Sequence, residues 1–154
     1  MSYNLFCDDC RTPLANHGEL PWVVVRNYPE FVATLKTHGL PDYTSLDHDL
    51  SRQAALLYYE MKKNRETEID YTRLTDRTGL DCLIKLMMAY IMDNTEDKPV
   101  KVNIHSHNKF GVAAMTDLLK RTMDGAEYDL TTIEHPFKLE GHLMPLRNDN
   151  ETNS

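Results

Sequence analysis

Acidic, histidine and small polar side chains follow short apolar runs at four places in this sequence. These places are Asp8-Asp9, Asp47-His48-Asp49, His105-Ser106-His107-Asn108 and His135. Carboxylates that lie close together suit a hard divalent cation such as Mg²⁺, and histidine can move a proton near neutral pH. If the four places meet in space, these residue types predict chemistry on phosphate esters assisted by a metal ion.

The apolar runs themselves predict short buried strands. They cover residues 3–7, 22–25, 43–46, 100–104 and 130–133. Between them lie segments of helical character, at residues 27–39, 52–66, 80–92 and 112–123. Strands that alternate with helices predict an α/β fold, a single doubly wound parallel sheet of about five strands with helices on both faces. Residues 52–74 form a helical insert in this scheme, and the polar stretch 64–77 is a candidate lid.

Local signals mark where two of the helices begin and end. Asn27 and Pro29 suit the start of one helix, and Gly39 suits its end. Thr78 and Asp81 suit the capping turn of another helix, where their side chains would satisfy free backbone N–H groups.

Parallel strands end at one edge of their sheet, and ligands of such sheets bind at this edge. The clusters that follow the first, third, fourth and fifth strands are far apart in the chain but share it. The sequence therefore predicts one site, in which Asp8, Asp9 and Asp47 lie within reach of a single cation.

These clusters resemble the acidic triad and the hydroxyl residue of response-regulator receiver domains, with His135 in the place of the receiver Lys. A closer resemblance is to the cyclic-phosphate-processing receiver domains, whose sequence blocks occur here in the correct order. The blocks are Cys7-Asp8-Asp9-Cys10-Arg11-Thr12-Pro13, Ser45 to Leu50, Thr78 to Asp81, and His105 to Asn108. Two departures are Lys109, where Pro is expected, and the long insert.

The resemblance implies a receiver-like (flavodoxin-like) domain over residues 1–146, followed by a disordered polar tail at 147–154. It implies Mg²⁺ or Mn²⁺ held by Asp8, Asp9 and Asp47. It also makes Asp47 the candidate nucleophile, because receivers accept a phosphoryl group on the third-strand Asp.

The other polar residues of these blocks receive catalytic or binding roles from their chemistry. Asp49 is expected to act as acid or base, and His48 or His105 to protonate a leaving alkoxide. The expected substrate-binding residues, which would hold phosphate oxygens or balance their charge, are Arg11, Ser106, His107, Asn108, Lys109 and His135.

Each cluster also has a purely structural interpretation. Asp47-His48-Asp49 suits a turn or a helix cap. His105 suits a buried, hydrogen-bonded histidine, because it follows an apolar strand directly. His135 weakens a receiver-type switch, which needs Lys at that position.

Three functions remain open at this level. The first is a metal-dependent phosphohydrolase or phosphodiesterase that acts on a cyclic or terminal phosphate of a nucleotide or RNA end. The second is a regulatory module that accepts phosphate on Asp47. The third is a non-catalytic binder that sequesters a phosphorylated nucleotide signal. A shared scaffold alone does not separate them.

The composition is that of a globular cytoplasmic protein. The 154 residues are 41% hydrophobic and 27% charged, with no apolar run near the roughly 18 residues of a membrane span and no signal-peptide pattern at the start. A net charge of −7 disfavours binding to long nucleic-acid duplexes or anionic lipid. Three cysteines, an odd number, suit a reducing compartment.

Overall fold

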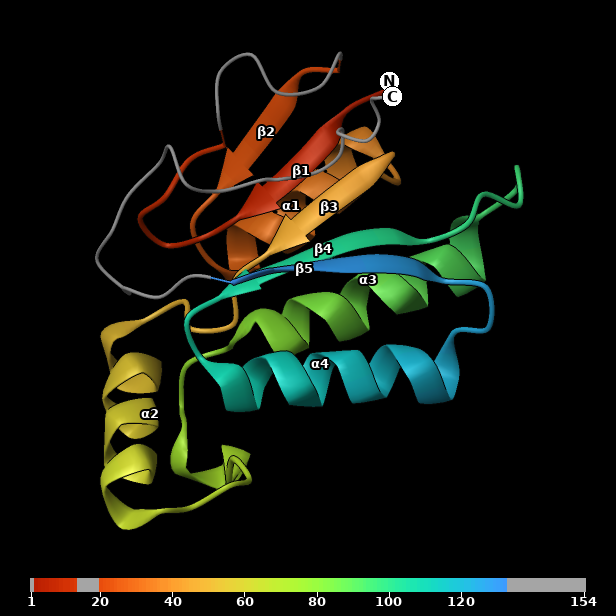
Figure 1. Cartoon of the computed structure of the whole chain (residues 1–154). Coiled ribbons are helices and arrows are strands. Elements are labelled where there is room, and N and C mark those ends of the chain that lie inside the picture. The colour runs from red at the N-terminus through yellow and green to blue at the C-terminus, as the bar shows by residue number, and fades with distance from the viewer. Residues whose placement is uncertain (1, 14–19, 133–154) are drawn as a thin grey trace.

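The computed structural model of the chain describes residues 2–13 and 20–132. Within these two ranges, five parallel strands form one sheet in the order β2-β1-β3-β4-β5 (Figure 1). The strands are β1 (Asn4–Cys7), β2 (Trp22–Val25), β3 (Tyr43–Leu46), β4 (Lys101–Ser106) and β5 (Glu127–Thr132). The predicted α/β fold with a parallel sheet is confirmed, and the strand order is the flavodoxin-like one.

In the described residues, four α-helices and one short 3₁₀ helix connect the strands. They are α1 (Tyr28–His38), α2 (Arg52–Asn64), the 3₁₀ helix η1 (Tyr71–Arg73), α3 (Gly79–Asp93) and α4 (Lys109–Thr122). The predicted ends of α1 are confirmed. The Asn27 side chain accepts a hydrogen bond from the Glu30 N–H, and Gly39 closes the helix with a φ of 79° that favours glycine.

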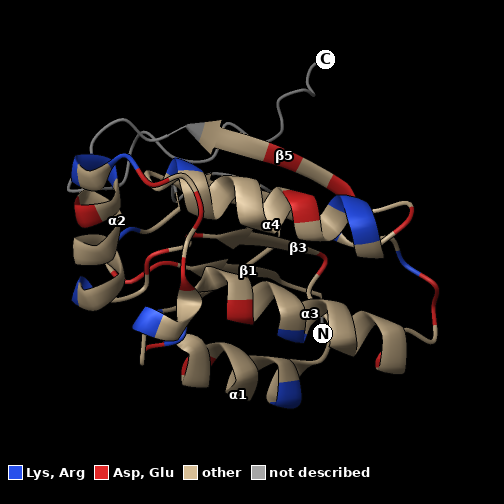
Figure 2. Cartoon of the chain, turned by 90° about the horizontal axis from the view of Figure 1, so that it is seen from below, with Lys and Arg blue, Asp and Glu red and all other residues tan. Residues whose placement is uncertain are grey.

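Helices α1, α3 and α4 pack against one face of the sheet, and Figure 2 shows α3 between α1 and α4. Their side chains share one buried apolar core with alternate residues of the strands. This core includes Leu5, Cys7, Leu46, Val102 and Ile104 from the sheet, and Phe31, Leu35, Leu83, Leu86, Met115 and Leu119 from the helices.

The direction of the crossovers explains why these helices share one face. The connections from β2 to β3, from β3 to β4 and from β4 to β5 all run the same way across the sheet. Right-handed crossovers that run the same way place their helices on the same side. Only the connection from β1 to β2 runs the other way, and its described residues, 8–13 and 20–21, contain no helix. The described residues therefore place helices on one face of the sheet, whereas helices on both faces were predicted.

The observed boundaries of β4, β5 and α4 differ from the predicted ones for reasons that the structure shows. Strand β4 continues to Ser106, because its pairing with β5 extends that far. Strand β5 begins at Glu127, three residues earlier than predicted. Helix α4 begins at Lys109 rather than at 112, because the Asn108 side chain caps it by accepting the N–H groups of Phe110 and Gly111.

The insert places α2 beyond the carboxyl ends of the strands, apart from the other helices (Figure 1). The polar segment after α2 is tied back to it. Arg73 forms an ion pair of 2.7 Å with Glu60, and the Gln53 side chain accepts the N–H groups of Thr75 and Asp76 at 2.9 and 3.0 Å. The stretch predicted as a candidate lid is thus bonded to α2 at several points.

None of the helices described in residues 2–13 and 20–132 combines the length and the hydrophobicity that crossing a bilayer requires. The predicted tail at 147–154 lies outside the described residues.

Candidate functional site

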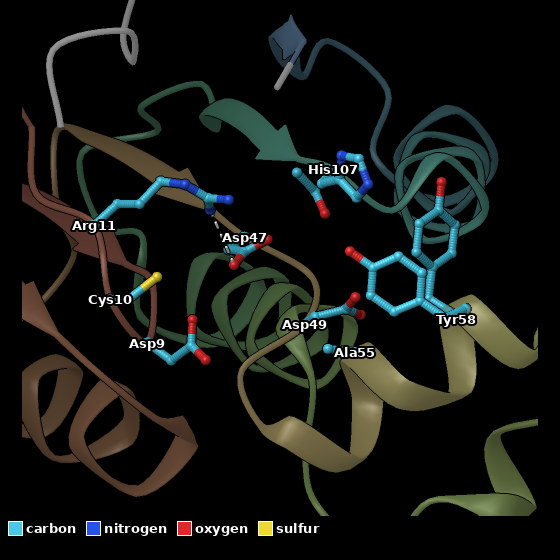
Figure 3. Close-up of a pocket in the computed structure, with 10 residues that line it drawn as sticks. Asp9, Cys10, Arg11, Asp47, Asp49, Ala55, Tyr58 and His107 are labelled. Atoms are coloured by element: carbon cyan, nitrogen blue, oxygen red, sulfur yellow. Dashed lines mark ion pairs between the residues drawn. The ribbon is translucent and has the colours of Figure 1, made fainter. Parts of the chain in front are cut away.

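An open pocket lies at the carboxyl ends of β1, β3 and β4. Ten residues line it: Asp9, Cys10, Arg11, Asp47, Asp49, Ala55, Tyr58, Tyr59, Ser106 and His107. Figure 3 shows Asp9, Cys10 and Arg11 on one side, Tyr58 and His107 on the other, and Asp47 and Asp49 between them. Six residues predicted for the site therefore face one pocket: Asp9, Arg11, Asp47, Asp49, Ser106 and His107.

Asp8 lies behind this pocket, fully buried, and protein donors surround its carboxylate. Its Oδ1 accepts the N–H groups of Cys10 and Arg11, at 2.9 and 2.8 Å. Its Oδ2 accepts Arg11 Nη1 at 2.8 Å and lies 2.9 Å from His105 Nε2. The local turn after β1 forms around this carboxylate.

The Arg11 guanidinium joins the residues after β1 to those after β3. Its Nη1 lies 2.8 Å from Asp8 Oδ2 and 3.5 Å from Asp47 Oδ2. Arg26 holds the same turn from β2, because its Nη1 donates to the carbonyls of Asp8 and Arg11 at 3.0 and 2.5 Å. Two carboxylates distant in sequence thus converge on one cationic side chain.

The two carboxyl groups beside Arg11 have pKa values shifted in opposite directions. Burial raises the pKa of Asp47 well above its usual range, and the charge of Asp8 adds to this effect more than Arg11 opposes it. Burial would also raise the pKa of Asp8, but the contacts with His105 and Arg11 lower it below its usual range. Asp8 is therefore a stabilised anion, whereas the charge of Asp47 is poorly compensated.

His48 is buried and belongs to the support of the site, which corrects its predicted role as a direct proton donor to substrate. Its Nδ1 lies 2.7 Å from Asp49 Oδ1, and its Nε2 lies 2.9 Å from the Tyr71 hydroxyl. Gly111 packs on the ring so closely that a Cβ there would come within 2.3 Å of it. His48 therefore positions Asp49 and does not face the pocket.

His105 is also buried, and the structural interpretation of this residue holds. It lies within β4, stacked on Phe6 with ring centroids 4.6 Å apart. Its Nδ1 lies 2.7 Å from Ser45 Oγ, and its Nε2 faces Asp8. Burial lowers the pKa of His105, although Asp8 opposes this shift. The predicted transfer of a proton from His105 to a leaving group is corrected to a contact with Asp8.

The remaining predicted residues divide between support of the site and other locations. Asn108 caps α4 and donates to Asp49 Oδ1 at 3.0 Å, so it acts on a pocket carboxylate from behind. Lys109 is exposed, with its Nζ 5.6 Å from the centre of the Phe110 ring, and it does not line the pocket. This location does not support a substrate contact for Lys109. His135 lies outside the described residues.

The start of α3 presses directly on the backbone of Asp47. The predicted cap is confirmed: Thr78 N–H donates to Asp81 Oδ2 at 2.8 Å, and Leu80 N–H donates to Thr78 Oγ1 at 3.2 Å. Gly79 N–H donates to the His48 carbonyl at 2.8 Å. A Cβ on Gly79 would lie 1.8 Å from the Asp47 carbonyl oxygen, so only glycine allows this approach.

A divalent cation would suit the pocket-facing carboxyl groups better than Asp8. Burial and the charge of Asp8 raise the pKa of Asp9 as they do that of Asp47, so an added cation would stabilise both anions. Asp8 already accepts four donors, and Arg11 stands between it and Asp47. Among the described residues, one set of three candidate ligand atoms lies within 4.8 Å of one another; it comes from Asp8, Asp9 and Cys10 and does not include Asp47. The predicted set of Asp8, Asp9 and Asp47 is therefore not gathered around one point in this structure. Asp9, Asp47 and Asp49 line the same pocket, so a cation bound in the pocket would draw on these three carboxyl groups.

The sequence did not identify four of the pocket residues: Cys10, Ala55, Tyr58 and Tyr59. Three of these belong to α2. The position of the insert in the sequence could have predicted them. An insert that directly follows Asp49 must leave the sheet at its carboxyl edge, where the pocket lies. The aromatic pair Tyr58-Tyr59 in such a helix is a candidate for a pocket wall.

One comparison with known proteins gives a match. The sequence profile of the family described as the cyclic-phosphate processing Receiver domain matches residues 3–121. The matched stretch runs from β1 into α4 and includes every residue that lines the pocket. No curated protein and no solved structure matches the chain.

Proposed function

The chain belongs to the family of cyclic-phosphate processing receiver domains, and on this premise we propose that it is a metal-dependent phosphoesterase. Its substrate is a cyclic or terminal phosphate of a nucleotide or of an RNA end. The observation that carries the proposal is that Asp9, Asp47 and Asp49 face the same pocket as Arg11. A phosphate needs a cationic partner, and its hydrolysis needs carboxyl groups that can attack or move a proton.

Each pocket residue has a role in this proposal. Arg11 pairs with a phosphate oxygen, and Ser106 donates a hydrogen bond to another. The Asp47 carboxylate attacks phosphorus, and the bond from phosphorus to one ribose oxygen breaks as that oxygen takes a proton from Asp49. Water, deprotonated by Asp49, then attacks phosphorus and releases Asp47 with the monoester as product.

Mg²⁺ or Mn²⁺, held by Asp9 and Asp47, would supply Lewis-acid stabilisation of the charge on the phosphate oxygens. Asp47 must be anionic in order to attack phosphorus, and its raised pKa opposes this. A cation beside Asp47 would favour the anion, so the reaction should depend on the metal. Chelation of divalent metal is therefore expected to abolish turnover, and added Mg²⁺ or Mn²⁺ to restore it.

The test is a panel of 2′,3′-cyclic, 3′,5′-cyclic and terminal phosphates, assayed with several divalent metals. We expect turnover of at least one compound, with loss of about 10³-fold or more in Asp47→Asn and Asp49→Asn, the scale seen when a residue central to the chemistry is removed. The matched control is Asp129→Asn, an acidic residue of β5 that lies away from the pocket. Absence of turnover with every metal would refute the proposal.

A second candidate function is a phosphoacceptor module. It is favoured by one observation: Asp47 and Ser106, from adjacent strands, face the same pocket, as the acceptor and hydroxyl of a receiver do. Acetyl phosphate should then label Asp47 stoichiometrically, without turnover of any ester. Protection of a bound nucleotide, with neither labelling nor turnover, would instead indicate a binder.

A further inference from the structure

The wall of the pocket opposite the carboxylates is aromatic. Tyr58 and Tyr59 of α2 line it together with His107, which follows β4. The Tyr58 ring packs edge-on against His107, with centroids 5.5 Å apart, and Tyr59 lies 6.4 Å from the same ring. Figure 3 shows Tyr58 and His107 across the pocket from Arg11 and Asp9.

Tyr59 is the member of this wall that offers free ring surface. It is 39% exposed, whereas Tyr58 is buried beneath it, between His107 and Phe110. A tyrosine combines a large apolar ring with a polar hydroxyl, and such side chains are enriched at binding interfaces. Here the exposed ring stands at the rim of a pocket whose other side carries Arg11.

The aromatic wall is held in place by contacts outside the pocket. Ser51 caps α2 by accepting the Ala54 N–H at 3.2 Å. The segment after α2 is bonded to it through Arg73 and Gln53, and Tyr71 ties the insert to His48. A stacking surface that is already positioned costs little ordering entropy when a ligand arrives.

From this arrangement we infer that Tyr59, supported by Tyr58 and His107, forms a nucleobase subsite, so that the ligand is a nucleoside cyclic phosphate and not a phosphorylated sugar or polyol. The inference rests on the proposed function for the position of the phosphate, beside Arg11. Arg11 and Tyr59 line the same pocket, so a base attached to the ribose of that phosphate would lie in the pocket that the Tyr59 ring lines. Stacking uses the π face that every base has. This subsite therefore favours ligands that carry a base but does not distinguish one base from another.

Binding measurements test the subsite separately from catalysis. The ligands are adenosine 2′,3′-cyclic phosphate, its base-free analogue 1-O-methylribofuranose 2,3-cyclic phosphate, and a short oligoribonucleotide that ends in a 2′,3′-cyclic phosphate. Calorimetry in the Asp47→Asn background keeps all three intact. We expect the two ligands with a terminal nucleoside to bind about tenfold more tightly than the base-free analogue. The mononucleotide and oligonucleotide arms show which source of the terminal nucleoside is preferred.

Substitutions on α2 then locate the effect. Tyr59→Ala should reduce nucleoside affinity to that of the base-free analogue and leave the analogue unchanged, whereas Tyr59→Phe should keep the preference. Leu56→Ala is the matched control, because Leu56 is 55% exposed on the same helix and does not line the pocket. Equal affinity for ligands with and without a base, or equal loss in the Leu56 and Tyr59 variants, overturns the inference. A base preference without turnover in the unsubstituted chain would retain the subsite and refute the phosphoesterase.

Discussion

The contact of Gly79 with Asp47 gives a sharp prediction about how the fold holds the site. Replacement of Gly79 by Ala places a Cβ 1.8 Å from the Asp47 carbonyl oxygen and 2.8 Å from its carbonyl carbon. Both atoms belong to the backbone, so neither can rotate away. The separation must grow by about 1.6 Å to reach the 3.4 Å of an ordinary contact, and the start of α3 and the Asp47 carbonyl must therefore move apart.

The expected cost follows from what this movement disrupts. Overpacking typically costs about 1–3 kcal/mol, and loss of the hydrogen bond from Gly79 to the His48 carbonyl adds about 1 kcal/mol. The higher helix propensity of Ala returns at most about 1 kcal/mol. Gly79→Ala should therefore lower the free energy of unfolding by about 1–3 kcal/mol. Because Asp47 shifts with its carbonyl, turnover should fall about 10²-fold even in the folded fraction.

Urea denaturation at neutral pH measures the first quantity, and steady-state kinetics under folded conditions measures the second. Lys109→Ala is the matched control. Lys109 occupies the first position of α4, as Gly79 does in α3, but its side chain is exposed, so its replacement should change stability by less than about 0.5 kcal/mol. If Gly79→Ala matches this control in stability and turnover, α3 does not fix the position of Asp47.

Three further substitutions test the electrostatics and the support of the site. The pKa of Asp47 is raised in the folded state, so the stability that this group contributes is lost as the pH rises above the ordinary pKa of Asp. Across that pH range, Asp47→Asn should be more stable than the unsubstituted chain. Urea titrations at several pH values measure this difference. Asp8 has a lowered pKa, so its contribution is present above the ordinary value and is lost as pH falls; Asp8→Asn, which leaves Arg11 under-compensated, should cost about 3–5 kcal/mol at neutral pH and less in acid. Tyr71→Phe removes the hydroxyl that lies 2.9 Å from His48 Nε2 and should cost about 1 kcal/mol by denaturation; an unchanged free energy of unfolding would show that this hydroxyl does not support His48.

The edge at which the site forms could be predicted from sequence. Each apolar run ends where charged residues begin, and parallel strands align these ends, which brings Asp9 and Asp47 into one pocket. The placement of β2 and β3 on either side of β1 is what the receiver-like resemblance implies, because the α/β pattern alone also fits other strand orders. The resemblance added the identity of the family, which the profile match bears out.

The residues of β4 that face away from the helices were harder to assign, although the sequence contained the alternation of apolar and polar residues that places them there. Val102 and Ile104 face the helices, so Asn103 and His105 must face the opposite side of the sheet. Asn103 and His105 both contact Ser45 there, in a buried polar chain. The predicted strand ended at residue 104, so His105 was treated as a residue beyond the strand and became a catalytic candidate.

The role of α2 could not be obtained from its periodicity. An amphipathic pattern shows which face of a helix is covered, but it does not show what covers that face. Tyr58 is buried by His107 and Phe110, which lie about fifty residues further along the chain. That contact depends on where the insert leaves the sheet, so it is set by tertiary structure.

The two carboxylates beside Arg11 differ in how firmly they hold its guanidinium. Asp8 accepts four donors and keeps its short contact of 2.8 Å with Arg11, whereas Asp47 lies 3.5 Å from the same nitrogen. A phosphate that approaches from the pocket therefore competes with Asp47 for the guanidinium, and not with Asp8. This competition leaves the negative charge of Asp47 with less positive charge beside it. A divalent cation next to Asp47 would supply the missing positive charge. Phosphate and cation should consequently each increase the affinity of the other, because the free-energy coupling between two ligands is reciprocal.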